Sequence, residues 1–554
     1  MFHNPFRINN KVRNVNSLRL WRMLLILLCR MVRPLQQALV LLLMLLLGTC
    51  LVYAEPEEEH RRIRKIHFYI SNINTEEQAQ EAFWAKTTNR LHIVTRESVV
   101  RKQILFKEGD VLDQELIEQS ERKLRRFAFL NVAQIKVVPV DHQSVDVEVR
   151  TRDAWTLVPG VNVSGGGGLA TGTVMLEELN LLGYGKKLLA EGIYESDVGW
   201  TGKFGYRDPQ LFNSRWIGTA TYTTGPLVES LFLGAARPLY SIDTKWSYGS
   251  AFFITDQTIR LFEEGEESSR FAKDQMFVQG YVKRAFGERF QKTNLKLELK
   301  YLQKDFSDLG SDTTEPPPPD QANVTPSIRI GKQGNISWQK FSYLNKMGLT
   351  EDTMLGPNYG AHVGYGIPVQ EGFELWDIGA YLMGNKTFIH KQLLKTILGV
   401  NSEVERNTFI NANARYYRKF TRHTVATRFL VNLGYELDSS KQFTLGADSG
   451  LRGYPARYFT GERLMVINLE DRQFWGEYTI GPKLALGTVL FVDAGNVWKE
   501  ADDAELNDLN WSAGTGLRLG WSNLPNQPIF RLDVGWAFDD PGGWAVTVGT
   551  EQQF

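Results

Sequence analysis

The feature that most constrains this chain is the alternation of apolar and polar residues in many short segments. In residues 530–538, FRLDVGWAF places Phe, Leu, Val, Trp and Phe at every second position, with Arg and Asp among the residues between them. Residues 198–207, 425–436 and 511–521 alternate in the same way. Successive side chains of a β-strand point to opposite faces, so each segment is predicted to be a strand with one apolar, aromatic face and one polar face.

Such strands recur through residues 153–554, which favours a transmembrane β-barrel. Barrels of this class have strands of about ten residues, apolar outside and polar inside, with aromatic residues near the strand ends. The sheet has to close, because no strand edge can stay unpaired in lipid. Allowing roughly 25 residues for each strand and its connection, we predict an antiparallel barrel of about 16 strands. A soluble all-β fold is the alternative, because its strands can alternate identically.

Residues 1–54 are predicted to be a signal peptide. They contain one long apolar run, residues 39–52, which follows basic residues and leads into a small-x-small cleavage pattern. A start at Met31 would give a signal peptide of ordinary length. A single helical membrane anchor is the alternative interpretation of this run. We expect the charged residues 55–65 to form a linker after cleavage.

Removal of the signal peptide changes both the cysteine content and the charge. Cys29 and Cys50 are the two cysteines of the chain, so the mature protein is expected to lack disulfides, thiol nucleophiles and cysteine metal sites. Residues 1–54 hold seven Lys or Arg and no Asp or Glu, which leaves 56 basic and 63 acidic residues. This balance argues against a nucleic-acid partner.

Residues 66–152 are predicted to form a small α+β domain. IHFYI at its start and the segments VAQIKVVPV and SVDVEVRTR at its end are strand candidates. Two amphipathic segments between them predict helices, one capped by Thr95 and ended by Gly109, the other capped by Asp113. The order strand, helix, helix, strand, strand fits a small sheet with helices on one face. Residues 71–93 are an insertion in this pattern.

One loop of the predicted barrel holds an arginine on a glycine hinge. Residues 446–464 read GADSGLRGYPARYFTGERL. Gly453 permits a tight turn beside Arg452, and Tyr454 supplies a large packing anchor. A planar guanidinium can bridge two carboxylates through paired hydrogen bonds, which lysine cannot do. The alternative is an exposed Arg-Gly turn that contributes little to stability.

The RGY core of this loop, followed by INLEDRQF and FVDAGNVW, resembles the outer-membrane assembly and translocation superfamily. This is the bacterial surface antigen family, whose members include BamA, TamA and FhaC. The resemblance implies a long extracellular loop that folds back into the lumen, where Arg452 pairs with Glu470 and Asp493. Residues two apart share a strand face, so Asn468 joins Glu470 there, and Gly495 joins Asp493. The predicted lumenal clasp consists of Arg452, Gly453, Tyr454, Glu470, Asp493 and Gly495.

The two ends of the mature chain fit the same resemblance. Residues 66–152 are similar to a single POTRA domain, the periplasmic module that precedes these barrels, although BamA-type proteins usually carry more of them. The terminal segment TVGTEQQF ends at Phe554 and resembles the C-terminal signal by which outer-membrane barrels are recognised for insertion. Gln552 departs from the apolar residue usual at its position. Gly549 is expected to weaken the seam between the first and last strands.

No catalytic arrangement such as GxSxG or HExxH stands out, so we expect neither enzyme activity nor a cofactor. The resemblance implies an outer-membrane barrel that assists insertion or translocation of proteins. Its POTRA domain would lie in the periplasm and capture unfolded or exported client proteins. Outer-membrane lipids and a periplasmic partner protein are further candidate partners. The alternatives are a secretion pore dedicated to one partner, a passive or structural barrel, and a lipid-homeostasis factor.

Overall fold

The computed structural model describes residues 61–81, 83–309, 316–342, 344–345, 347, 350–369, 373–388, 392–479, 483–499, 505–521, 529–541 and 543–554. The predicted signal peptide and most of the predicted linker fall outside this part of the chain. Within it, no helix has the length and apolar character needed to cross a membrane.

The N-terminal domain is a small α+β unit, in the predicted order but with two short helices in the insertion. Its elements are β1 (Arg62–Ser71), α2 (Glu76–Glu81), α3 (Phe83–Leu91), α4 (Glu97–Gln103), α5 (Gln114–Arg125), β2 (Leu130–Pro139) and β3 (Ser144–Asp153). In the sheet order β1-β3-β2, β3 runs parallel to β1 and antiparallel to β2. Val147 and Val149 of β3 form the core with Val100 of α4 and Leu124 of α5.

The two predicted helix caps of this domain have different outcomes. Helix α5 begins as predicted, because the Asp113 carboxylate accepts two backbone N–H groups of the first turn at 3.0 and 3.3 Å. The predicted Thr95 cap is wrong, because the Thr95 hydroxyl donates instead to the buried Asp153 carboxylate at 2.8 Å. Helix α4 therefore has no side-chain cap, and it ends at Gln103 rather than at Gly109.

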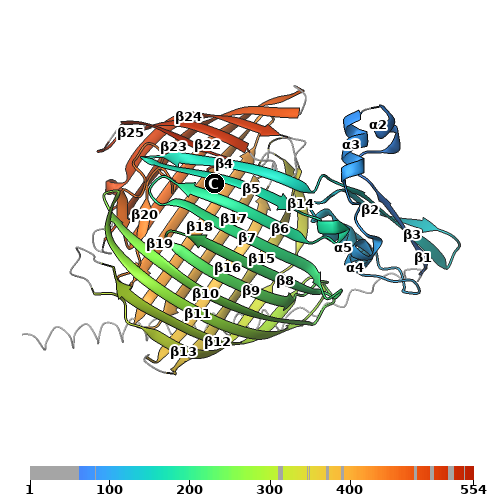
Figure 1. The fold of residues 1–554 in the computed structure, drawn as a ribbon, viewed down its shortest axis with the longest axis horizontal. Coiled ribbons are helices and arrows are strands. Elements are labelled where there is room, and N and C mark those ends of the chain that lie inside the picture. Colours follow the sequence, from blue (N-terminus) through green and yellow to red (C-terminus); the bar gives the residue numbers. More distant parts are fainter. Residues whose placement is uncertain are drawn as a thin grey trace, which may run out of the picture. The chain divides into compact units, whose positions relative to one another are not determined.

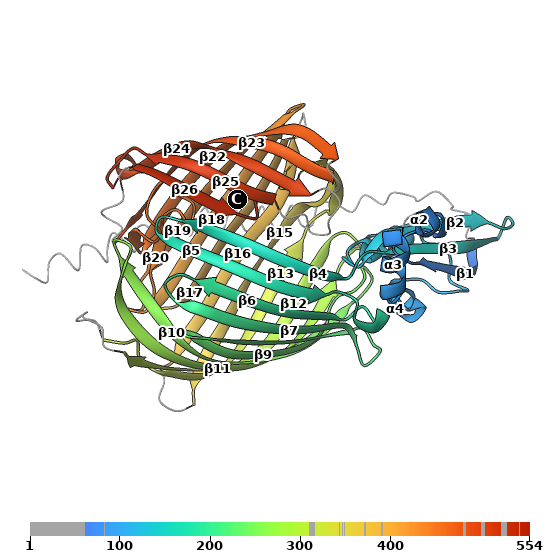
Figure 2. The ribbon, with the colours of Figure 1, turned by 45° about the horizontal axis from the view of Figure 1, so that its top comes forward.

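The rest of the chain forms a closed antiparallel β-barrel of 20 strands. The first ten are β4 (Leu157–Gly166), β5 (Leu169–Glu178), β6 (Lys187–Glu195), β7 (Gly199–Leu211), β8 (Trp216–Gly225), β9 (Val228–Arg237), β10 (Trp246–Glu263), β11 (Glu266–Phe286), β12 (Lys292–Asp308) and β13 (Gln321–Gln333). The others are β15 (Thr350–Pro368), β16 (Leu375–Phe388), β17 (Gln392–Glu403), β18 (Arg406–Lys419), β19 (His423–Tyr435), β22 (Arg463–Thr479), β23 (Lys483–Trp498), β24 (Asn510–Trp521), β25 (Ile529–Ala537) and β26 (Gly543–Gly549). Figure 1 and Figure 2 show these strands running obliquely around the closed sheet.

The barrel has more strands than the prediction of about 16, because many of its turns are short. Two residues join β8 to β9, and Glu264 and Gly265 alone join β10 to β11. The φ angles of Glu264 and Gly265 are +50° and +89°. Positive φ at both central residues is the backbone of a type I′ hairpin turn, which suits the twist of the adjoining strands.

The predicted alternation is confirmed in the barrel wall. Apolar and aromatic side chains cover the outer face; Trp200 and Phe204 of β7, for example, are 58% and 53% exposed. Alternate residues face inward, where the wall carries charged, amide and glycine residues. The polar lumen and the apolar exterior are those expected of a barrel that crosses a membrane.

Three segments of the chain lie inside the barrel. The first is the loop between β19 and β22, which contains the small hairpin of β20 (Phe443–Leu445) and β21 (Phe459–Gly461). The second is the connection from β14 (Ser337–Ser342) to the start of β15, with which β14 pairs at the edge of the barrel sheet; Leu344 of this connection packs in one cluster with Phe554. The third is residues 550–554, and the chain end marked C lies within the barrel outline in Figure 1 and Figure 2.

Candidate functional site

Three carboxylates project into the lumen from the C-terminal part of the wall. Glu470 lies on β22, Asp493 on β23 and Asp533 on β25, and all three are 0% exposed. Each follows an apolar residue on the outer face, so strand alternation directs each carboxylate inward. Three like charges buried together require counter-charges, because an unpaired buried ion is strongly destabilising.

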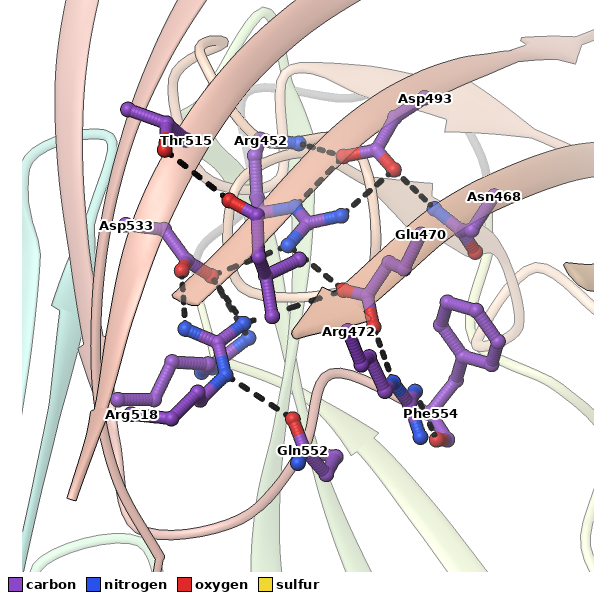
Figure 3. Close-up of polar contacts among 12 residues, drawn as sticks. Arg452, Asn468, Glu470, Arg472, Asp493, Thr515, Arg518, Asp533, Gln552 and Phe554 are labelled. Atoms are coloured by element: carbon purple, nitrogen blue, oxygen red, sulfur yellow. Dashed lines mark hydrogen bonds and ion pairs between the residues drawn. The ribbon is translucent and has the colours of Figure 1, made fainter. Parts of the chain in front are cut away.

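Arg452 supplies the central counter-charge, as Figure 3 shows. Its Nε and Nη2 donate to the two oxygens of Asp493 at 2.7 and 2.9 Å, a bidentate pair. Its Nη1 donates to Glu470 Oε1 at 2.9 Å and to Asp533 Oδ2 at 3.0 Å. The guanidinium also lies 3.5 Å from the ring centroid of Phe491. One fully buried arginine therefore ties the loop to three strands.

The loop residues next to Arg452 fix the position of its side chain. Gly453 has a φ of +98°, and a Cβ there would lie 3.1 Å from the backbone nitrogen of Ala537. A glycine is therefore needed both for the turn and for the close approach to β25. The Tyr454 hydroxyl donates to the backbone carbonyl of Trp511 at 2.9 Å, and the Leu451 side chain is fully buried.

Three further arginines extend the network. Arg472 Nε donates to Glu470 Oε2 at 2.7 Å, and Arg518 donates to Asp533. Arg531 Nη1 is 3.7 Å from Asp533 Oδ2. Four arginines thus lie around the three side-chain carboxylates.

The C-terminus and the β14–β15 hairpin are attached to the same network. Arg472 donates from Nη2 to the backbone carbonyl of Phe554 at 2.9 Å and from Nη1 to that of Leu344 at 2.8 Å. Arg518 Nε donates to Gln552 Oε1 at 2.9 Å. Phe554 packs into a buried apolar cluster with Leu344 and Tyr417. Glu470 therefore connects the loop of Arg452 to the two other segments inside the barrel.

This arrangement holds segments of the chain in place inside the barrel. Guanidinium–carboxylate pairs fix geometry and can be exchanged when a segment moves. Among the residues that the structure describes, no group of three or more His, Cys, Asp or Glu side chains could hold a metal ion.

The structure brings together the predicted residues Arg452, Glu470 and Asp493, with Gly453 and Tyr454 beside them. The sixth, Gly495, lies against the loop, because a Cβ there would approach Leu445 Cδ2 to 2.9 Å. The sequence prediction missed Asp533, Arg518 and Arg472. Their inward position follows from the alternation of β25, β24 and β22, and that signal was present in the sequence.

The end of the chain differs from the prediction. The last strand ends at Gly549, so Phe554 is not on an alternating strand but turns inward and is 6% exposed. The contacts of Arg518 with Gln552 and of Arg472 with Phe554 account for this turn. A Cβ at Gly549 would lie 2.7 Å from Arg531 Nη2, so this glycine makes room for the network. That the C-terminus is an insertion signal stays a prediction.

The barrel closes through a short seam. In the described residues, β26 and β4 pair at one position, Val548 opposite Gly165, whereas β4 and β5 pair along their whole length. The loop of Arg452 also contacts this region, since the Ala456 N–H donates to the Gly167 carbonyl at 2.9 Å. A Cβ at Gly167 would lie 2.1 Å from the Ala456 nitrogen. The loop therefore contacts the hairpin that forms one side of the seam.

Comparison with known proteins places these residues in a family. Residues 381–553, which include all of the clasp, match the Omp85 superfamily domain. By sequence, no curated protein matches the chain.

Several solved structures are similar. BamA from Haemophilus ducreyi lacking POTRA domains 1–3 is 14% identical, with a TM-score of 0.42 over 89% of this chain and 84% of that chain. CdiB from Acinetobacter baumannii is 12% identical, with a TM-score of 0.45 over 89% and 74% of the two chains. CdiB from Escherichia coli is 14% identical, with a TM-score of 0.43 over 89% and 77%. The family match is confined to residues 381–553, which are an Omp85 superfamily domain, and the chain is a bacterial outer-membrane β-barrel protein.

Proposed function

We propose that this protein assists the insertion or translocation of client proteins at the outer membrane. The observation that carries the proposal is the combination of a loop clasped inside the lumen with a minimal seam. Arg452 ties this loop to three strands of the wall. At the same time β26 and β4 share one paired position among the described residues. A barrel whose wall is paired this weakly at one place is suited to lateral release of a client into the membrane.

The N-terminal domain is the proposed capture module, located in the periplasm. Strand β2 is an outer strand of the three-stranded sheet. An extended client segment can add to such an edge through main-chain hydrogen bonds, which provide affinity without strict sequence choice. Outer-membrane lipids and a periplasmic partner protein are further proposed partners.

A disulfide across the seam tests the insertion route. Val548 and Gly165 are Cα partners, so cysteines at both positions meet the distance that a disulfide requires. Assembly of client barrels in cells should stop when Val548→Cys/Gly165→Cys is oxidised and resume on reduction. The matched control is Val163→Cys/Gly172→Cys, which links β4 to β5 and leaves the seam free. Normal assembly with the seam oxidised would remove the insertion route.

A secretion pore dedicated to one partner is the second candidate, and the polar, cation-rich inner wall favours it. In that case deletion of the gene would remove one secreted protein and leave the outer-membrane barrels unchanged. A passive channel would instead show a large, steady conductance that Arg452→Ala does not alter.

A further inference from the structure

Three cations lie directly opposite one another on the inner wall, far from the Arg452 network in sequence. Lys283 of β11 is the Cα partner of Lys296 of β12, and Lys296 is the partner of Arg329 of β13. Their neighbours Val282 and Leu297 are 43% and 54% exposed on the outer face, so the three cations face the lumen. Like charges directly opposite each other destabilise a sheet. This row is therefore kept at a cost in stability.

The wall neutralises this row only in part. Lys296 pairs with Glu298 on its own strand. For Lys283 and Arg329, the described part of the chain offers no hydrogen bond and no ion pair. A second row of partners, Lys395, Arg415 and Arg428, repeats the pattern on β17, β18 and β19.

The first row lines a cavity of about 270 Å³ at the end of the lumen where β11 ends and β12 begins. The side-chain Oδ1 of Asn294 in the same lining is buried without a hydrogen-bond partner. A buried acceptor of this kind calls for a donor such as a peptide N–H. The cavity thus combines two cations that have no ion pair in the described part of the chain, Lys283 and Arg329, with an unsatisfied amide oxygen.

A larger neighbouring cavity, of about 800 Å³, continues the cationic lining toward the N-terminal domain. The two cavities share Gln119 of α5 in their walls. The larger one is also lined by Lys123, Arg126 and Arg215, and by two glutamates, Glu115 and Glu118, that pair with Arg122. Arg215 Nη1 is buried without a hydrogen-bond partner, and the guanidinium lies 4.1 Å from the centroid of the Tyr240 ring. Burial, together with the nearby Arg215 and Arg126, lowers the pKa of Lys123 to about 8. The aromatic ring of Trp338, 40% exposed, belongs to the same lining.

We infer that these two cavities, together the basic vestibule, bind an acidic, aromatic-containing segment of an extended polypeptide. Carboxylate side chains would neutralise Lys283 and Arg329, the peptide groups would pair with Asn294, and aromatic side chains would pack near Trp338. A membrane lipid fits less well, because the outer faces of the same strands are apolar and the cations face the lumen. The inference rests on the proposed function and names the class of client segment that enters the barrel.

The test measures peptide binding to the full-length protein in detergent micelles. The probe is a fluorescent peptide of about 15 residues with alternating Glu and Phe, roughly 50 Å long when extended and so longer than the two cavities together. It is compared by anisotropy with its Gln–Phe counterpart. The Glu peptide should bind at least about tenfold more tightly at low salt, and the difference should shrink as salt is added.

Variants locate the binding. Replacing Lys283, Lys296 and Arg329 together by Gln should remove the preference for the Glu peptide. The matched control replaces three cations of the outer face, Arg284, Lys332 and Lys386, by Gln and should keep the preference. Urea unfolding of both triple variants checks that each barrel still folds, because Lys296→Gln removes the partner of Glu298 as well as the opposed like charges.

The outcomes separate this inference from the proposed function. Equal binding of the two peptides to the wild type overturns the inference, whether or not the variants fold. The inference is also overturned if the inner and outer triple variants reduce the preference for the Glu peptide by the same amount. Competition by inorganic polyphosphate that exceeds that of the unlabelled Glu peptide would assign the vestibule to a phosphate-bearing ligand instead. If the wild type binds the Glu and Gln peptides equally while the seam disulfide still blocks assembly, this inference fails and the proposed function stands.

Discussion

Replacing Arg452 by alanine should be among the most damaging single substitutions in the barrel. The guanidinium neutralises three fully buried carboxylates. After its removal, Glu470 keeps Arg472 at 2.7 Å, and Asp533 keeps Arg518. Among the described donors, Asp493 keeps two neutral ones, the Asn468 amide at 2.8 Å and the backbone N–H of residue 452 at 3.4 Å. Most of the lost stability should therefore come from the unpaired charge of Asp493. Removing one partner of a buried ion pair lowers the free energy of unfolding by about 3–5 kcal/mol.

Urea unfolding of the barrel in lipid bilayers, followed by tryptophan fluorescence, measures this free energy. Arg452→Ala should lower the free energy of unfolding by about 3–5 kcal/mol. Adding Asp493→Asn to that variant should recover roughly 1 kcal/mol or more, because it removes the stranded charge. Adding Glu470→Gln instead should recover less, because Arg472 then loses its acceptor.

The same loop provides a matched control. Arg457 pairs with Asp197 at 2.9 Å, but the two side chains are 19% and 27% exposed. Arg457→Ala should cost no more than about 1 kcal/mol, as partly exposed ion pairs usually do. The reasoning is refuted if Arg452→Ala costs no more than Arg457→Ala, or if Asp493→Asn recovers nothing.

Three further predictions follow from separate contacts. Gly167→Ala places a Cβ 2.1 Å from the Ala456 nitrogen, so it should displace the loop of Arg452 and raise the conductance of the barrel in planar bilayers. Gly168→Ala is the control, because a Cβ there has nothing within 4 Å, and it should leave the conductance unchanged. Arg472→Gln removes the donors that hold Phe554 and Leu344, so carboxypeptidase should release Phe554 faster than from the wild type; an unchanged rate would contradict the proposed role of Arg472. In the N-terminal domain, the hydrogen bond from Arg64 lowers the pKa of Asp146 to about 2. Its stabilising effect is therefore present above the ordinary aspartate pKa and lost as pH falls through about 2. In Arg64→Gln the NMR titration midpoint of Asp146 should rise toward the ordinary value, and a midpoint that stays near 2 would refute the assignment.

The part of the clasp that could be predicted from sequence is the part encoded locally. Glu470 and Asp493 each lie in a strand whose alternation fixes their inward direction, and Arg452 lies in a glycine-rich loop of recognisable motif. The alternation of apolar and polar residues in their strands predicts the inward direction of Arg518 and Asp533 equally well. Which inward charges meet depends on strand tilt and stagger around the barrel, and no local pattern contains that information.

The strand number, the Thr95 cap and the position of Phe554 also differ from the sequence prediction. The strand number was underestimated because connection lengths were assumed, whereas Glu264 and Gly265 alone make a full turn. Thr95 has the sequence of a helix cap, but the buried Asp153 carboxylate competes for its hydroxyl. Phe554 continues an alternating pattern, yet Arg472 and an apolar cluster draw it into the lumen. In the last two cases a tertiary contact overrides a local preference.

Quantitative proteomics of the outer-membrane and secreted fractions tests the central claim most directly. The gene is deleted and then complemented with the wild type or with the oxidised seam variant Val548→Cys/Gly165→Cys. The account predicts that deletion depletes several outer-membrane barrel proteins, that the wild type restores them, and that the locked seam does not. Unchanged outer-membrane and secreted fractions after deletion would contradict a role in handling client proteins.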